Sequence, residues 1–362
     1  MKKAFPFFSV SSIVSTSGLV ITLFLTSICF IQCSKPYHPA TLDDSHEVFL
    51  AGMEMSGPGG KGVAKVWTNG VPVSLTDGSA YAEAYGIAVS GSDVYACGAQ
   101  VIGPGGTTVA RLWKNGQATD LSDGSYSAFA NSMCITGTDV YVAVTGQVMP
   151  ADSVFSKIWK NGSMTALHNS NRSAAIYSVF AAGADVYAGG MEPIGPGLGA
   201  ALVWKNGAVS TLGDGVKTSV IDAIFVSGAD TWACGHGENA SGESVARVWK
   251  NGTEVPLTDE TYGSGASSVY VSGTDVYICG YIRNVNGTSI ATLWKNGVPT
   301  SLSDGSWDAT GKAVFVKGSD VYAVFNDVNS SGISAANLWK NGVVTAVTDR
   351  TKDAWVNAIY VR

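Results

Sequence analysis

Charged residues are scarce in this sequence of 362 residues. Asp, Glu, Lys and Arg together make up 14%, the formal net charge is −6, and no basic run interrupts the acidic balance. An acidic surface repels a phosphate backbone. We therefore expect no nucleic acid partner.

Histidine and the common catalytic motifs are also rare. The four histidines are His38, His46, His168 and His236, and none is spaced as a metal-binding pair. No Gly-x-Ser-x-Gly motif occurs, and no Gly-rich loop is followed by the Lys-Ser/Thr of a P-loop. We expect no metal and no cofactor, no motif assigns a catalytic residue, and catalysis is kept as an alternative.

Long apolar runs occur only at the N-terminus. Lys2 and Lys3 precede residues 4–34, which contain no charge, and this pattern is typical of a signal peptide. The run ends at Gln32-Cys33-Ser34, which resembles the lipobox of bacterial lipoproteins, although Gln32 stands where that motif has a small residue. The resemblance implies that Cys33 is lipidated and becomes the new N-terminus after cleavage.

These features predict a signal peptide over residues 1–33 and a short linker over 34–46. The chain is then exported to the cell envelope, where the lipid on Cys33 anchors it to the outer membrane. Plain secretion and an uncleaved membrane anchor are the alternatives. No later apolar run approaches the roughly 20 residues that a membrane-spanning helix needs.

A repeat fills the rest of the chain. Two markers recur in phase with it, Gly-x-Asp before an apolar pair and Leu-x-Asp-Gly. Such periodicity predicts a repeat architecture. The main marker, Trp-x-Asn-Gly, occurs seven times at spacings of 45 or 46 residues, beginning at Trp67, Trp113, Trp159, Trp204, Trp249, Trp294 and Trp339.

Each repeat contains four expected strands. In one copy they cover 130–136, 140–144, 157–159 and 164–167, and the last two are joined by Asn161-Gly162, a signal for a two-residue type I′ hairpin. Four antiparallel strands in 45 residues are typical of a propeller blade. The sequence therefore predicts an all-β fold, a single seven-bladed β-propeller over residues 47–362.

The two ends of the chain predict how the ring closes. The pattern begins with the second strand of a blade (48–52) and finishes with a first strand (356–361). We expect the C-terminal strand to complete the N-terminal blade, which closes the ring and removes an exposed edge.

The repeat also resembles a known family. Ser-Asp-Val-Tyr-x-x-Gly, Leu-Trp-Lys-Asn-Gly and Leu-Ser-Asp-Gly are similar to the repeat of uncharacterised bacterial β-propeller lipoproteins, over roughly residues 45–362. The resemblance implies the propeller and the lipid anchor, and it specifies fold far better than function.

Most recurrent residues are explained by structure. We expect the seven tryptophans to fill the wedge between blades, and the Asp of Gly-x-Asp to bond the backbone amides of its own turn. We expect the Asp of Leu-x-Asp-Gly to order the crossing to the next blade. Cys97, Cys234 and Cys279 occupy one equivalent position in three repeats and are expected to be buried free thiols.

Function is sought where the copies differ, in the crossing from the fourth strand to the next blade. Five residues separate an outer variable position from an inner one at the start of the first strand, and the following residues, such as 86–89, are small or apolar. We expect the two positions to form concentric rings around one mouth of the central channel. The outer position holds Ala80, Tyr126, Arg172, Lys217, Tyr262, Trp307 and Lys352, and the inner one Tyr85, Asn131, Tyr177, Asp222, Ser267, Lys312 and Asn357.

Aromatic rings beside amide and charged groups suit a sugar or a polar protein segment. We therefore predict a monomeric binding propeller whose ligand is a carbohydrate or an envelope protein. A glycan-active enzyme that uses Asp222, Asp308 or Asp353 is one alternative. A ligand-free assembly scaffold, or a solvated rim that binds nothing, is the other.

Overall fold

A computed structural model describes residues 45–148, 153–167, 173–195, 198–213 and 217–362. These residues form 28 strands, and within those ranges no helix is long and apolar enough to cross a membrane. The expected signal peptide (1–33), the lipidation site Cys33, nearly all of the 34–46 linker and the candidate Arg172 lie outside the described residues.

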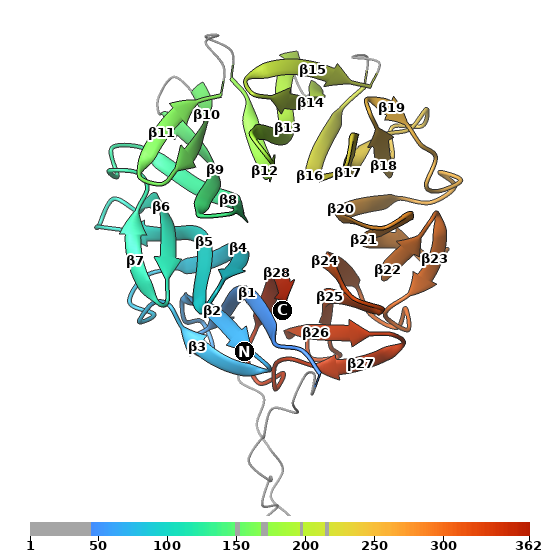
Figure 1. Cartoon of the computed structure of the whole chain (residues 1–362). Helices are drawn as coiled ribbons and strands as arrows, with labels where there is room; N and C mark the ends of the chain where they lie inside the picture. Colours follow the sequence, from blue (N-terminus) through green and yellow to red (C-terminus); the bar gives the residue numbers. More distant parts are fainter. Residues whose placement is uncertain (1–44, 149–152, 168–172, 196–197, 214–216) are drawn as a thin grey trace, which may run out of the picture. The chain divides into compact units, whose positions relative to one another are not determined.

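The strands form seven four-stranded antiparallel sheets arranged as the blades of a ring (Figure 1). The predicted seven-bladed β-propeller is confirmed. From the inner to the outer strand, blade 1 contains β28 (Ala354–Val361), β1 (Val48–Met55), β2 (Gly62–Thr68) and β3 (Val71–Ser74); blade 2, β4 (Ala82–Ser90), β5 (Asp93–Ile102), β6 (Thr107–Lys114) and β7 (Gln117–Asp120); blade 3, β8 (Ser127–Thr136), β9 (Asp139–Val148), β10 (Ser153–Lys160) and β11 (Ser163–Ala166). Blade 4 contains β12 (Ala175–Ala182), β13 (Asp185–Gly195), β14 (Leu198–Lys205) and β15 (Ala208–Leu212); blade 5, β16 (Ser219–Ser227), β17 (Asp230–Glu238), β18 (Ser244–Lys250) and β19 (Thr253–Glu254); blade 6, β20 (Ser264–Ser272), β21 (Asp275–Arg283), β22 (Ser289–Lys295) and β23 (Val298–Ser301); blade 7, β24 (Ala309–Lys317), β25 (Asp320–Val328), β26 (Ser334–Lys340) and β27 (Val343–Ala346).

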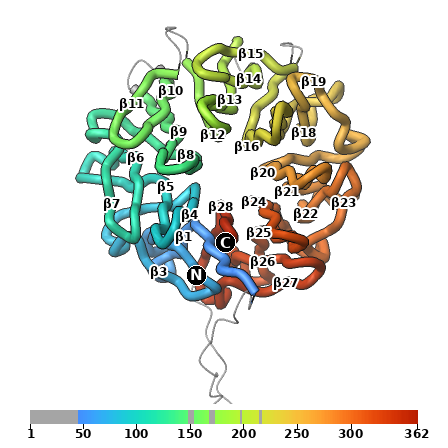
Figure 2. Tube along the Cα trace, in the orientation of Figure 1, coloured from blue at the N-terminus to red at the C-terminus, as the bar shows by residue number. Residues whose placement is uncertain are grey.

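The ring closes through blade 1, as the two ends of the sequence predict. β28 pairs antiparallel with β1, from Val48 opposite Val361 to Glu54 opposite Ala354. Beyond the ladder, the backbones of Glu47 and Arg362 exchange two hydrogen bonds of 3.1 and 3.2 Å. Figure 2 shows the blue first strand beside the red last strand. Because the last strand supplies the inner edge of blade 1, that blade has no unpaired inner edge.

The tryptophans pack between blades, as expected. Trp67 on β2 is 2% exposed and lies in a cluster with Tyr322, Val324 and Leu338 of blade 7. Trp113, Trp204, Trp249 and Trp294 are buried to the same extent. Loss of such a ring costs about 3–5 kcal/mol, so these residues belong to the framework that holds the channel open.

The Asn-Gly hairpins have the predicted geometry, but one prediction about the turns was wrong. Asn115 has a φ of +50° and the following Gly116 of +81°, as a type I′ turn requires. Asp93 of Gly-x-Asp does not bond its own turn; it accepts a 2.7 Å hydrogen bond from Asn115 Nδ2 and pairs with Lys114 Nζ. The reason is that the hairpin between strands three and four lies beside the turn between strands one and two, so charge-assisted bonds across the blade replace a local one.

The other turn prediction is confirmed. Asp77 Oδ1 accepts hydrogen bonds from Ser79 N and Oγ, which fixes the crossing into blade 2. The equivalent bonds occur at Asp123, Asp259, Asp304 and Asp349. Cys97, Cys234 and Cys279 are fully buried and free, also as expected.

Candidate functional site

The central channel is lined by the first strand of every blade. It contains a cavity of about 360 Å³, near the lower end of the roughly 300–1,000 Å³ range of small-molecule sites. Each of these strands has a register shift at one point, so one residue per blade has no partner on the second strand. Such a β-bulge bends the strand and redirects a side chain. The seven bulged residues are Tyr85, Asn131, Tyr177, Asp222, Ser267, Lys312 and Asn357, and all of them line the cavity.

The expected inner ring is thus a ring of bulges, here called the polar ring. The sequence pattern placed these seven residues together, and the structure supplies the reason: a bulge at the same point in every blade. The polar ring combines phenol, amide, hydroxyl, carboxylate and ammonium groups at one level of the channel.

Two members of the polar ring also join neighbouring blades. Asn131 Nδ2 donates to the carbonyl of Ile176 in blade 4 at 2.7 Å. Asn357 Nδ2 donates to the carbonyl of Ala84 in blade 2 at 3.0 Å and to Glu83 at 2.8 Å. The amide nitrogens therefore hold the ring together, while neither Oδ1 accepts a bond within the described residues.

The only carboxylate among the residues that line the described channel cavity is Asp222. His236 Nδ1 donates to Asp222 Oδ2 at 2.9 Å across strands β16 and β17. The hydrogen bond raises the pKa of His236 above its usual value, because it stabilises the imidazolium form. Burial, and then the charge of Asp222, raises the pKa of Tyr177, so this phenol stays protonated. The channel wall at blades 4 and 5 therefore offers hydrogen-bond donors beside a paired carboxylate.

A second level of the channel is aromatic and was missed by the sequence reasoning. Three residues beyond the polar ring, five consecutive blades hold Phe180, Phe225, Tyr270, Phe315 and Tyr360, all of which line the cavity. Neighbouring ring centroids lie 4.8–5.2 Å apart, at tilts of 46–55°. Such spacing is within the range of favourable aromatic pairs. We call these five side chains the aromatic arc.

The remaining two blades leave the arc incomplete. Their equivalent residues are Ala88 and Cys134, which are small, so the wall opposite the arc recedes. At about 3.3 Å per residue, the arc lies roughly 10 Å along the strand from the polar ring. The expectation that these strand residues are uniformly small or apolar was wrong at this column. Aligning the seven copies would have revealed it, since five of seven are aromatic.

The outer variable position does not line the channel cavity. Five residues of extended chain span up to about 17 Å, so the outer position lies along the crossing, towards the periphery of the ring. Tyr126 packs edge-on against Phe155, with centroids 4.8 Å apart. Lys217 donates to the carbonyl of Asn239, and both line a pocket of about 180 Å³ on blade 5.

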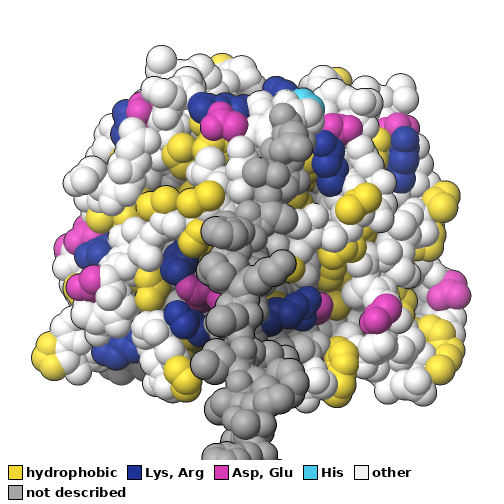
Figure 3. Space-filling model, turned by 90° about the horizontal axis from the view of Figure 1, so that it is seen from below, with side chains coloured by type: hydrophobic (Ala, Val, Ile, Leu, Met, Phe, Trp, Pro, Cys, Tyr) yellow, Lys and Arg dark blue, Asp and Glu magenta, His cyan; other side chains and the backbone are white. Residues whose placement is uncertain are grey.

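The other outer residues lie at the surface. Tyr262 is 41% and Trp307 50% exposed, Trp307 lines a separate pocket on blade 7, and Ala80 and Lys352 are partly exposed. On the side of the ring seen in Figure 3, acidic and basic side chains lie interspersed. The structure thus brings the inner residues together in one cavity and leaves the outer ones separate.

The three carboxylates of the glycosidase alternative do not share this cavity. Asp308 Oδ1 accepts a 2.8 Å hydrogen bond from Ser289 N, and Asp353 Oδ1 one from Ser334 N. Both bonds tie a crossing to the start of a third strand, and neither residue lines the channel. Over the part of the chain that the structure describes, no group of three or more His, Cys, Asp or Glu could hold a metal ion.

No family model matches this sequence, and no curated protein matches it. Among solved structures, the acylaminoacyl peptidase of Pyrococcus horikoshii is 10% identical with a TM-score of 0.41; the match covers 75% of this chain and 53%, about half, of the peptidase. The β-propeller domain of the Trilobed protease from Pyrococcus furiosus is 12% identical with a TM-score of 0.39, over 74% of this chain and 96% of that one. A GH43_1 enzyme from Xanthomonas citri, complexed with xylose, is 9% identical with a TM-score of 0.37, over 78% and 95%. At these values the matches add nothing about what this chain binds.

Proposed function

We propose that this chain is a binding propeller whose central channel holds a carbohydrate. The observation behind the proposal is the change of wall chemistry inside one cavity, from the polar ring to the aromatic arc. A sugar has the same two kinds of surface, an apolar C–H face and a rim of hydroxyl groups. Aromatic rings pack against the first, and amide, hydroxyl and charged groups bond the second.

The size and asymmetry of the cavity support a short ligand. A volume of about 360 Å³ suits one or two sugar rings better than a folded partner. Because the arc covers five blades and leaves Ala88 and Cys134 opposite, a flat ligand packs against one side only. Asn131 and Asn357 each have an amide oxygen that no described residue bonds, so both can accept a hydroxyl group.

The setting of this function is also part of the proposal. The signal-peptide pattern and Cys33 support export and a lipid anchor at the outer membrane, with the propeller acting as a monomeric capture module. An envelope protein that inserts a polar segment into the channel is the second partner that the same wall chemistry would accept.

A glycan array tests the proposal on the full chain. The channel variant combines Asp222→Asn with Phe225→Ala and so removes one group from the polar ring and one from the arc. Tyr262→Ala, which removes an exposed ring outside the channel, is the matched control. We expect at least one short glycan to bind, and its affinity to fall tenfold or more in the channel variant only. Equal binding by the channel variant, or no glycan binding by the folded chain, would refute the proposal.

A further inference from the structure

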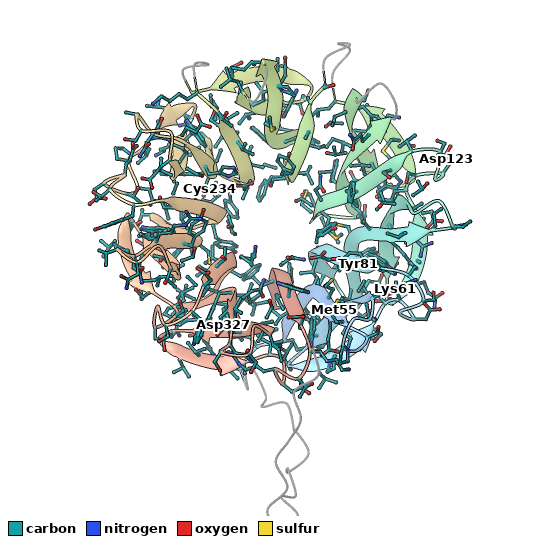
Figure 4. The ribbon with its side chains drawn as sticks, turned by 180° about the vertical axis from the view of Figure 1, so that it is seen from behind. Met55, Lys61, Tyr81, Asp123, Cys234 and Asp327 are labelled. Atoms are coloured by element: carbon teal, nitrogen blue, oxygen red, sulfur yellow. The ribbon has the colours of Figure 1, made fainter. Side chains whose placement is uncertain are left out.

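Blade 7 has a second pocket outside the channel, of about 540 Å³. It lies between the crossing that enters the blade and the crossing that leaves it, and Figure 4 shows Asp327 in the body of the ring rather than at its open centre. Its lining includes Trp307, Asp327, Asn337 and Arg350. None of these residues lines the channel cavity, so the pocket is separate from the site proposed above.

Trp307 is the first feature that distinguishes this pocket. Half of its surface is exposed, whereas the repeat tryptophans at Trp67 and Trp113 are at most 2% exposed. An exposed Trp beside polar groups offers a flat apolar face together with hydrogen-bonding neighbours. The equivalent residue in blade 5 is Lys217, so the feature belongs to blade 7 and not to the repeat.

Arg350 is the second feature. Its Nη2 donates to Asp327 Oδ2 at 2.8 Å and to Asn337 Oδ1 at 3.1 Å, which fixes the guanidinium at the pocket wall. Nε and Nη1 make no hydrogen bond to the described residues, so they can donate to a ligand. In blades 1, 2 and 5 the corresponding cation is on the third strand, at Lys65, Arg111 and Arg247.

The backbone of Arg350 is held in an unfavourable conformation. Its φ is +60°, a left-handed value that costs a residue with a Cβ roughly 1 kcal/mol. Three other blades have Gly78, Gly124 and Gly305 at the equivalent position, with φ of +77° or +78°. Strain of this kind concentrates at functional sites. Here it places the guanidinium next to Trp307.

Asp327 supplies the third feature. Its Oδ1 is buried and accepts no hydrogen bond from the described residues, and a buried acceptor without a donor costs about 1–3 kcal/mol. The whole side chain is 21% exposed, so a small rotation brings this oxygen to the pocket. A hydroxyl group there would supply the missing donor.

We infer that this pocket is a second carbohydrate site, with Trp307 stacking on one sugar ring. Arg350 Nε and Nη1 donate to its hydroxyl oxygens, and Asp327 Oδ1 accepts a hydroxyl proton. The site is independent of the channel, and a glycan with several sugar units could be bound at both places.

A glycan array and calorimetric titration of the best glycan test the inference on the full chain. Trp307→Ala removes the stacking face and alters an exposed residue, so the fold is unaffected. Arg350→Gly removes the guanidinium and restores the glycine of other blades, so its Tm should equal or exceed that of the parent. Glu260→Gly is the matched control, since Glu260 has a φ of +59° at the equivalent position after blade 5.

We expect a glycan whose affinity falls tenfold or more in Trp307→Ala and in Arg350→Gly, and changes less than twofold in Glu260→Gly. The Asp222→Asn channel variant should retain this binding. If both blade 7 variants bind every glycan as the parent does, or if the folded chain binds none, the inference is overturned. A glycan lost only in the channel variant would support the proposed function and overturn this one.

Discussion

Deletion of residues 354–362 removes β28 and should destabilise the whole ring. Val356, Ile359 and Val361 are at most 7% exposed, and burial of each contributes about 1.5–3 kcal/mol. Their loss alone amounts to roughly 5–9 kcal/mol, which approaches the entire free energy of unfolding of a typical domain, about 5–15 kcal/mol. The deletion also exposes the inner edge of β1, a template for pairing with other chains.

Circular dichroism melting and size-exclusion chromatography with light scattering measure the two effects. We expect the truncated chain to lose its cooperative transition or to melt far below the parent, and to form soluble aggregates. Arg362→Ala is the matched control. It removes only the ion pair with Glu47, whose side chains are 38% and 43% exposed, and such a pair contributes less than about 1 kcal/mol. If the truncated chain melts like the parent, blade 1 does not depend on β28 and the closure argument fails.

Three further predictions concern single side chains. Asn296→Ala should lower the free energy of unfolding by about 2 kcal/mol, from a strained φ and lost bonds to Val276 N and Asp275. Asn296→Gly should cost only about 1 kcal/mol in urea unfolding, and equal costs would contradict the strain argument. The raised pKa of His236 means that its pair with Asp222 stabilises the fold fully below pH ~6.5 and that this stabilisation is lost as pH rises through the raised value. NMR titration should show that pKa fall in Asp222→Asn; an unchanged value would exclude the pair as its cause. Burial raises the pKa of Cys134 to about 12, so mass spectrometry should find this thiol alkylated only after denaturation.

Much of the fold could be predicted because it depends on local chemistry that recurs. Asn-Gly specifies its hairpin through the positive φ of both residues, and Leu-x-Asp-Gly specifies the crossing through bonds only two residues apart. The closure was also predictable, because the repeat begins and ends at different strands. Asp93 shows the limit of such reasoning: its partners, Lys114 and Asn115, are some 20 residues away, and only the packed blade brings them near.

The candidate site was predictable only in part. The polar ring could be found because copies that differ at one column point to a variable surface. The aromatic arc was missed although it was visible in the same alignment of copies, because Phe and Tyr in a strand usually indicate core. The outer position was expected beside the channel, but nothing in a spacing of five residues says in which direction the crossing runs.

The sequence by itself determined the number of blades, the four strands in each and the closure of the ring, because these follow from periodicity and turn chemistry. Tertiary structure alone decided which variable residues share a cavity. Bulges turn seven side chains into the channel, curvature of the ring brings five aromatic rings into contact, and the crossings carry Trp307 and Arg350 to a separate pocket. Such contacts join residues from different blades, and their distances are set by the shape of the ring rather than by separation along the chain.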